Sequence, residues 1–233
     1  PVGYTWYHAL QVRAEKRFAH GYTFQLSYTY SKAMQATEFL NATDPVPYES
    51  ISDLDFTHHL VMSGIWELPF GRGKRFGNRL PAPVNAVLGG WQLNGVVQRQ
   101  SGPPLKWGDV WTLFTGDPNS VALPKDERSV DRWFNTGAGF NRNSSQQLSD
   151  NIRVSPLRFS GIRGDGQARW DLSAIKHFHL TEKANLELRA ECLNALNHPN
   201  LGTPNLTPTS SAFGTITKQD VPRSWQMALQ VGF

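Results

Sequence analysis

The sequence predicts an all-β fold: an antiparallel, up-and-down sheet of about seven to eight long strands that forms part of a transmembrane β-barrel. Three observations predict it. Apolar and polar residues alternate with a period of two over several long segments. The connections between these segments alternate between tight and long. The polar positions hold mainly Gln, Ser, Thr and Asn, which is typical of a hydrated barrel interior.

The alternation is perfect over residues 22–31, where aromatic residues and Leu alternate with Thr, Gln and Ser. The same pattern occurs over 60–70, 91–98 and 170–174, and again at 225–233, where the chain ends. Residues i and i+2 of a strand lie on the same face, so each segment predicts a strand with one apolar and one polar face.

Two further segments, 6–18 and 184–195, fit both a strand and a helix. Their residues alternate, but the composition is helix-forming, and Leu186, Ala190 and Leu193 also make a helical stripe. We predict strands for both because their neighbours are strands and the connections to them are short.

The connections indicate which solvent surrounds the sheet. Outer-membrane barrels have short periplasmic turns and long extracellular loops, whereas a compact soluble domain rarely tolerates structureless loops beyond about 15 residues. The turns at 19–21 and 181–183 are tight. The segment 71–89 is intermediate and is the weakest fit, because it falls on the periplasmic side. The long loops, all on the extracellular side, are about 35–57, 102–167 and 197–224.

Composition excludes several classes of protein. The chain has 233 residues, a formal net charge of +4 and one Cys, so it has neither a disulfide framework nor a Cys-based zinc cluster. No apolar run approaches the roughly 20 residues of a membrane-spanning helix. The pI of about 9.3 is not accompanied by a basic stripe with interleaved aromatics, so no nucleic-acid partner is expected.

The same inspection finds no sign of chemistry. There is no Gly-x-Ser-x-Gly nucleophile elbow, and the seven His residues lack the spacing of three or four convergent metal ligands. We therefore expect no catalytic residue, no metal and no cofactor, and a protein that is not an enzyme.

Three groups of residues are candidates for function. Polar side chains predicted to face the barrel lumen and the substrate are Gln25, Ser27, Thr29, Gln92, Asn94, Gln98, Glu187, Arg189 and Glu191. Loop aromatics that either stack on a ligand or pack the loop into a lid are Trp107, Trp111, Phe114, Trp133 and Phe140. The end of the last strand resembles the assembly signal recognised by the outer-membrane barrel-assembly machinery, with Leu229, Val231 and Phe233 as its residues.

Many short motifs resemble a known family, in the family's order and over nearly the whole chain. They include Gly64-Ile65-Trp66-Glu67-Leu68-Pro69-Phe70-Gly71 and Trp170-Asp171-Leu172-Ser173, and further matches occur at 7–13, 21–32, 89–95, 101–104, 189–200 and 213–217. Together they are similar to the barrel of TonB-dependent receptors, above all the Oar-like group, whose full-length members usually carry a carboxypeptidase-regulatory-like domain at the N-terminus.

The resemblance implies a transporter in the outer membrane of a Gram-negative-type bacterium, with about 22 barrel strands closed by a plug. Residues 1–233 would be the C-terminal segment of that barrel, without the plug domain. The implied partners are outer-membrane lipid, the barrel-assembly machinery, TonB through missing N-terminal regions of the parent protein, and an unknown small-molecule or oligomeric substrate. The implied function is energy-coupled uptake of a scarce nutrient.

Two other functions remain open from the residues alone. One is a secreted β-sandwich that binds glycans through the loop aromatics. The other is a passive outer-membrane porin or adhesin, which would share the barrel but lack a plug. Whether the loop 102–167 contains an additional hairpin is also open.

Overall fold

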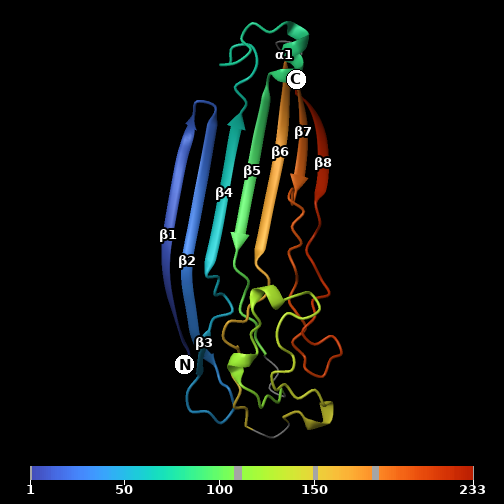
Figure 1. Ribbon diagram of the computed structural model, residues 1–233. Helices are drawn as coiled ribbons and strands as arrows, with labels where there is room; N and C mark the ends of the chain where they lie inside the picture. The colour runs from blue at the N-terminus through green and yellow to red at the C-terminus, as the bar shows by residue number, and fades with distance from the viewer. Residues whose placement is uncertain (1, 108–111, 149–151, 180–183, 233) are drawn as a thin grey trace.

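The computed structural model describes residues 2–107, 112–148, 152–179 and 184–232, and its described strands form one antiparallel sheet (Figure 1). Each long strand follows its predecessor along the sheet. The long strands are β1 (Tyr4–Ala19), β2 (Tyr22–Glu38), β4 (His58–Glu67), β5 (Trp91–Gln100), β6 (Gln167–His179), β7 (Asn185–Leu193) and β8 (Ser224–Gly232).

The sheet order is β1-β2-β4-β5-β6-β7-β8, and the short strand β3 (Tyr48–Ile51) pairs with the far end of β2. Every pairing is antiparallel. Strands β1 and β8 each have one free edge in the described part of the chain, so the sheet is an open section of wall. The predicted all-β, up-and-down antiparallel fold is confirmed.

Both ambiguous segments are strands, β1 and β7. Several strand ends differ from the prediction: β2 runs on to Glu38, which shortens the first long loop to residues 39–57. The prediction that 60–70 is one strand was wrong at its end, because β4 stops at Glu67. Pro69 has no N–H to donate to a neighbouring strand, so the chain leaves the sheet there.

The connections divide between the two ends of the sheet (Figure 1). The short-turn end carries the β1–β2 hairpin, whose turn residues His20 and Gly21 have φ angles of 56° and 83°. Positive φ at both central residues matches the right-handed twist of the flanking strands. The long-loop end carries residues 39–57, 101–166 and 194–223. The predicted tight β1–β2 turn and the three long loops are therefore confirmed, while the predicted turn at 181–183 lies outside the described residues.

The intermediate connection between β4 and β5 contains the helix α1 (Ala82–Leu88), which accounts for its length. The indole Nε1 of Trp91 donates to the carbonyl oxygen of Val87 at 2.8 Å and holds the helix against the start of β5. Among the described residues, no helix combines the length and the apolar character needed to cross a membrane.

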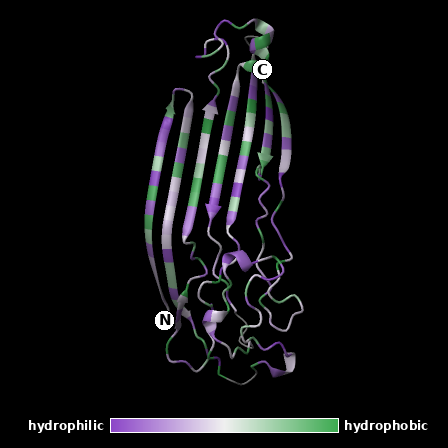
Figure 2. Ribbon diagram, viewed as in Figure 1, coloured by the Kyte–Doolittle hydropathy of each residue, from purple (hydrophilic) through white to green (hydrophobic). Residues whose placement is uncertain are grey.

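Directly paired residues share a face, so the registers divide the strand residues between two faces. The row Leu26, Met62, Val97 and Trp170 runs across four strands on what we term the apolar face. The neighbouring row is Ser27, Val61, Gln98 and Arg169, and it lies on the opposite, mainly polar side, which we term the polar face. Figure 2 shows the resulting alternation of hydrophilic and hydrophobic residues along each strand.

The apolar face is open to its surroundings. Trp66 is 48% exposed and Leu229 is 66% exposed, and no second sheet covers them in the described part of the chain. A β-sandwich would bury these side chains between two sheets. The structure therefore rejects the β-sandwich alternative.

Basic side chains bound the apolar face at both ends. On β2 the apolar stretch runs from Phe24, which pairs with Lys16, to Lys32. On β5 it runs from Trp91, which pairs with Lys176, to Arg99. Both stretches have the length of the about 9–11 residues with which a tilted strand crosses a bilayer. The apolar face therefore has the height of a hydrocarbon layer.

Replacing Met62 by Arg should destabilise the protein in a bilayer by about 2–4 kcal/mol, because Met62 lies midway along the apolar stretch of β4. The matched control is Ser63→Arg, one residue along the same strand but on the polar face, where a charge meets water. Denaturant titration of the protein in phospholipid vesicles measures both free energies of unfolding. Equal losses for the two variants would contradict the assignment of the faces.

Candidate functional site

The nine predicted lumen-facing side chains all lie on the polar face. The register carries this face across the sheet, since Asn94 of β5 pairs with Ser173 of β6, which pairs with Glu191 of β7. Hydrogen bonds follow the same path: the Asn94 amide donates to Ser173 Oγ at 3.2 Å, and the Gln92 amide donates to Asn94 Oδ1 at 2.8 Å. The structure thus brings these side chains onto one mainly hydrophilic face, which Val61, Ile65 and Val96 interrupt on β4 and β5.

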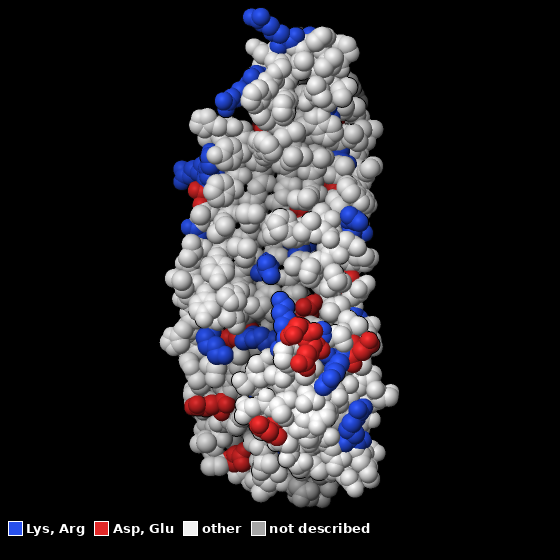
Figure 3. Space-filling view, in the orientation of Figure 1, with Lys and Arg blue, Asp and Glu red and all other residues white. Residues whose placement is uncertain are grey.

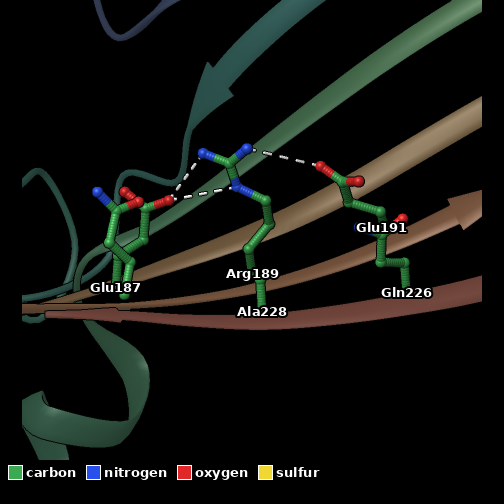
Figure 4. A pocket seen from close by; sticks show the side chains of 6 residues that line it. Glu187, Arg189, Glu191, Gln226 and Ala228 are labelled. Carbon is green, nitrogen blue, oxygen red and sulfur yellow. Dashed lines mark hydrogen bonds and ion pairs between the residues drawn. The ribbon is translucent and has the colours of Figure 1, made fainter.

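The densest charge on this surface is the β7 charge cluster, which consists of Glu187, Arg189 and Glu191 (Figure 4). The Arg189 guanidinium lies between the two carboxylates, 2.8 Å from Glu187 Oε1 and 3.7 Å from Glu191 Oε1. The strand period of two places all three side chains on one face. The opposing residue on β8 is Ala228, whose small side chain leaves a hollow beside the guanidinium.

The cluster has one positive and two negative charges, and amides extend it. Gln226 and Gln230 of β8 line the same hollow, opposite Glu191 and Glu187. The Arg189 side chain is 42% exposed, so it remains hydrated and available for exchange with a solute. Such groups bind polar solutes through hydrogen bonds and charge, and they need no covalent step. In the described residues, no three His, Cys, Asp or Glu side chains gather as a metal site would require.

The long loops form a compact unit with its own core. Trp107 is 1% exposed, and its ring lies 4.9 Å from that of Phe159 in a T-shaped contact. Phe134 is completely buried. The residues of this loop core are Leu105, Trp107, Phe114, Val121, Phe134, Phe140, Phe159, Ile162 and Phe213.

The loop core shows where the predicted loop aromatics lie. Trp107, Phe114 and Phe140 belong to it, so their rings are packed against each other and face no solvent. Trp133 is partly buried against the core, and its Nε1 donates to the Arg163 carbonyl at 2.7 Å. Trp111 lies outside the described residues. These positions favour the interpretation that the aromatics pack the loop over stacking on a ligand. The described part of 101–166 contains isolated bridges and three short 3-10 helices, Pro118–Ser120, Lys125–Glu127 and Ser144–Gln146, but no additional hairpin.

Two ion pairs, each with one buried member, join the loop 101–166 to the loop 39–57. Asp55 is completely buried, accepts a hydrogen bond from the Ala33 N–H at 2.5 Å, and forms an ion pair with Arg163. Arg158, also buried, contacts Asp53 Oδ1 at 2.5 Å and donates to Ser50 Oγ at 2.9 Å. Sequence reasoning missed these pairs, because the partners are more than a hundred residues apart.

The third long loop joins the same unit. The backbone N–H of Trp133 donates to the Gly214 carbonyl at 2.9 Å, and that of Ile216 donates to the Val130 carbonyl at 2.7 Å. Arg142 donates to the Ser210 carbonyl at 2.9 Å. The three long loops therefore form a single body at one end of the sheet.

The predicted assembly signal is only partly described. Leu229 and Val231 lie on the apolar face of β8 and are exposed, while Phe233 lies outside the described residues. The single Cys192 is buried on the apolar face, as expected for a small hydrophobic residue.

Removing the Asp55 carboxylate should loosen the loop body, because the Asp55→Ala variant leaves the Ala33 N–H and the Arg163 guanidinium without their buried partner. We expect local opening to become easier by about 3 kcal/mol, measured as faster amide hydrogen exchange in 39–57 and 101–166. The control is Asp126→Ala, an exposed carboxylate without an ion pair in the described part of the chain. Unchanged exchange in Asp55→Ala would show that the pair is dispensable.

A cysteine at Gln226 should react with a charged, membrane-impermeant maleimide when the protein is in a bilayer, because Gln226 lies on the polar face. A cysteine at the adjacent Met227 lies on the apolar face and should remain unlabelled. Both variants carry Cys192→Ala to remove the native thiol. Equal labelling at the two positions would refute the separation of a water-facing and a lipid-facing side.

Comparison with known proteins agrees with this geometry. A family model described as an outer membrane beta barrel domain matches residues 1–226, which is nearly the whole chain. No curated protein and no solved structure gives a match. The open apolar face, the hydrophilic opposite face and the division of turns and loops are the features such a domain requires. The chain therefore belongs to the family of outer membrane beta barrel domains, and its location is the outer membrane.

Proposed function

We propose that this chain supplies barrel wall and outer loops to a TonB-dependent receptor of the Oar-like group, which imports a scarce nutrient. The observation that carries the proposal is the loop body at one end of a wall with a mainly hydrophilic face. Two of its long loops, 101–166 and 194–223, share an apolar core, and ion pairs join the third loop to them. The motif resemblance, spread over nearly the whole chain, supports the same assignment.

A packed loop body suits a receptor. Binding a dilute solute tightly requires a surface that is ordered before the solute arrives, because ordering it afterwards costs free energy. The ion pairs of buried Arg158 with Asp53 and of buried Asp55 with Arg163 supply that order. A passive pore for small solutes does not bind them tightly, so it does not need outer loops that are ordered in this way.

Transport of this kind needs binding and gating and no covalent chemistry, so we propose that the protein is not an enzyme. The solute is a small or oligomeric polar molecule that passes from the loop body to the polar face. There the β7 charge cluster and the amides of Gln92, Asn94 and Gln98 offer successive hydrogen bonds and charges.

Three partners follow from the proposal. The apolar face contacts outer-membrane lipid, and the exposed edge and apolar residues of β8 are presented to the barrel-assembly machinery. The third partner is TonB, which would act through N-terminal regions of the parent protein and deliver the energy that moves the plug.

The full-length parent protein tests the proposal in planar bilayers bathed in potassium chloride. A receptor closed by a plug should show no steady conductance, whereas the same protein without its plug should conduct, because the wide lumen is then open. The full-length protein should also retain the C-terminal domain of TonB in a pull-down. A steady open channel without TonB binding would contradict the proposal and favour the passive porin.

A further inference from the structure

A groove lies on the apolar side of the sheet, at the level where the strands meet the loop body. On the side of the sheet, Tyr28 and Leu60 form an apolar wall, and Trp133 of the loop body also lines the groove. Three basic side chains line it as well: Arg99 from the end of β5, and Lys125 and Arg128 from the loop 101–166. Figure 3 shows that the sheet above is mostly uncharged on this side, while charged side chains gather near the loop body.

Arg99 is a charged residue on the apolar face, and the strand pattern gives no reason for a charge there. It lies on the apolar face, where it pairs with Leu60 on one side and Ala168 on the other. It is exposed and forms no ion pair within the described residues. A charged side chain on the lipid-facing side of a barrel is costly unless it reaches the polar headgroup layer. Arg99 stands at the end of the apolar stretch, where it reaches that layer.

The loop body supplies two more positive charges. Lys125 is exposed in the short 3-10 helix Lys125–Glu127, and the Arg128 Nε donates to the Leu123 carbonyl at 2.9 Å, which fixes the guanidinium at the groove. His58 also lines the groove, and its Nδ1 shares a hydrogen bond of 2.8 Å with the Tyr28 hydroxyl.

Carboxylates in and near the groove reduce its positive charge. Asp165 lines the groove, but its Oδ2 accepts a hydrogen bond from the Leu201 N–H at 3.1 Å. Asp126 and Glu127 follow Lys125 in the chain and do not line the groove. Of the residues that line it, three are Lys or Arg and one is acidic, so the groove is positive by two charges.

We propose that this groove binds the phosphorylated headgroup of an outer-membrane lipid, with the phosphate between Arg99 and Lys125. The acyl chains then lie along Leu60 and Tyr28, in the hydrocarbon layer that the apolar face already contacts. The apolar wall matches the acyl tail of a lipid, and the basic residues beside it match a phosphorylated headgroup. A free phosphate ion has no apolar part to contact the wall. The proposal needs only the membrane location and is independent of the transport function.

Native mass spectrometry of the full-length parent protein in detergent tests the proposal. Dioleoyl phosphatidic acid should remain bound in preference to dioleoyl phosphatidylcholine, and inorganic phosphate alone should not displace it. The Arg99→Gln/Lys125→Gln variant should lose affinity for phosphatidic acid by about fivefold for each charge removed. The charge-preserving Arg99→Lys variant should retain most of that affinity.

The matched control is Arg75→Gln/Arg79→Gln, which removes the same charge from the β4–β5 connection at the short-turn end. It should bind phosphatidic acid like the unaltered protein. Equal losses in both double variants would overturn the proposal, as would displacement of the lipid by inorganic phosphate. If the groove variant does not fold, as judged by its heat-modifiable mobility in electrophoresis, Lys125→Gln alone in the exposed loop decides the question by the same comparison.

Discussion

A strand in hydrocarbon must satisfy its backbone hydrogen bonds within the sheet and present apolar side chains to the lipid, and the rest of this structure depends on that constraint. It explains why a single sheet leaves side chains such as Trp66 and Leu229 uncovered. It also explains why basic residues such as Lys32 and Arg99 stand at the ends of the apolar stretches. The free edges of β1 and β8 carry unpaired N–H and C=O groups, which hydrocarbon does not tolerate, so in a membrane these edges need strand partners.

The loop body obeys a different constraint, because water surrounds it. Its aromatic core, centred on Trp107 and Phe134, resembles the core of a small soluble domain. The chain has already left the sheet, so the buried backbone and charged groups need other partners. Asp55 finds them in the Ala33 N–H and Arg163, and Arg158 finds them in Asp53 and Ser50. One chain therefore combines a sheet whose apolar face suits contact with lipid and a loop body whose buried core suits surrounding water.

These two parts divide the functional surfaces. The polar face, with the β7 charge cluster, presents hydrogen-bonding groups and charges along the wall. The loop body presents an ordered surface at one end of that wall. The groove beside Lys125 faces the lipid, where Arg99 lies between apolar and charged surroundings. Each surface thus meets a different medium: enclosed water, bulk water and the membrane.

The sequence by itself determined the strands, their two faces and the alternation of turns and loops, because a period of two and a turn such as His20-Gly21 are local properties of the chain. The nine polar residues share one face in the strand registers, and their contact with a lumen and a substrate stays a prediction. Only the tertiary structure decided the loop body, the Asp55–Arg163 pair and the groove at Arg99. These join residues from distant segments, and no local pattern records which loop packs against which. The end of β4 before Pro69 shows the same limit on a smaller scale, since alternation continues in the sequence after the hydrogen bonds of the sheet have stopped.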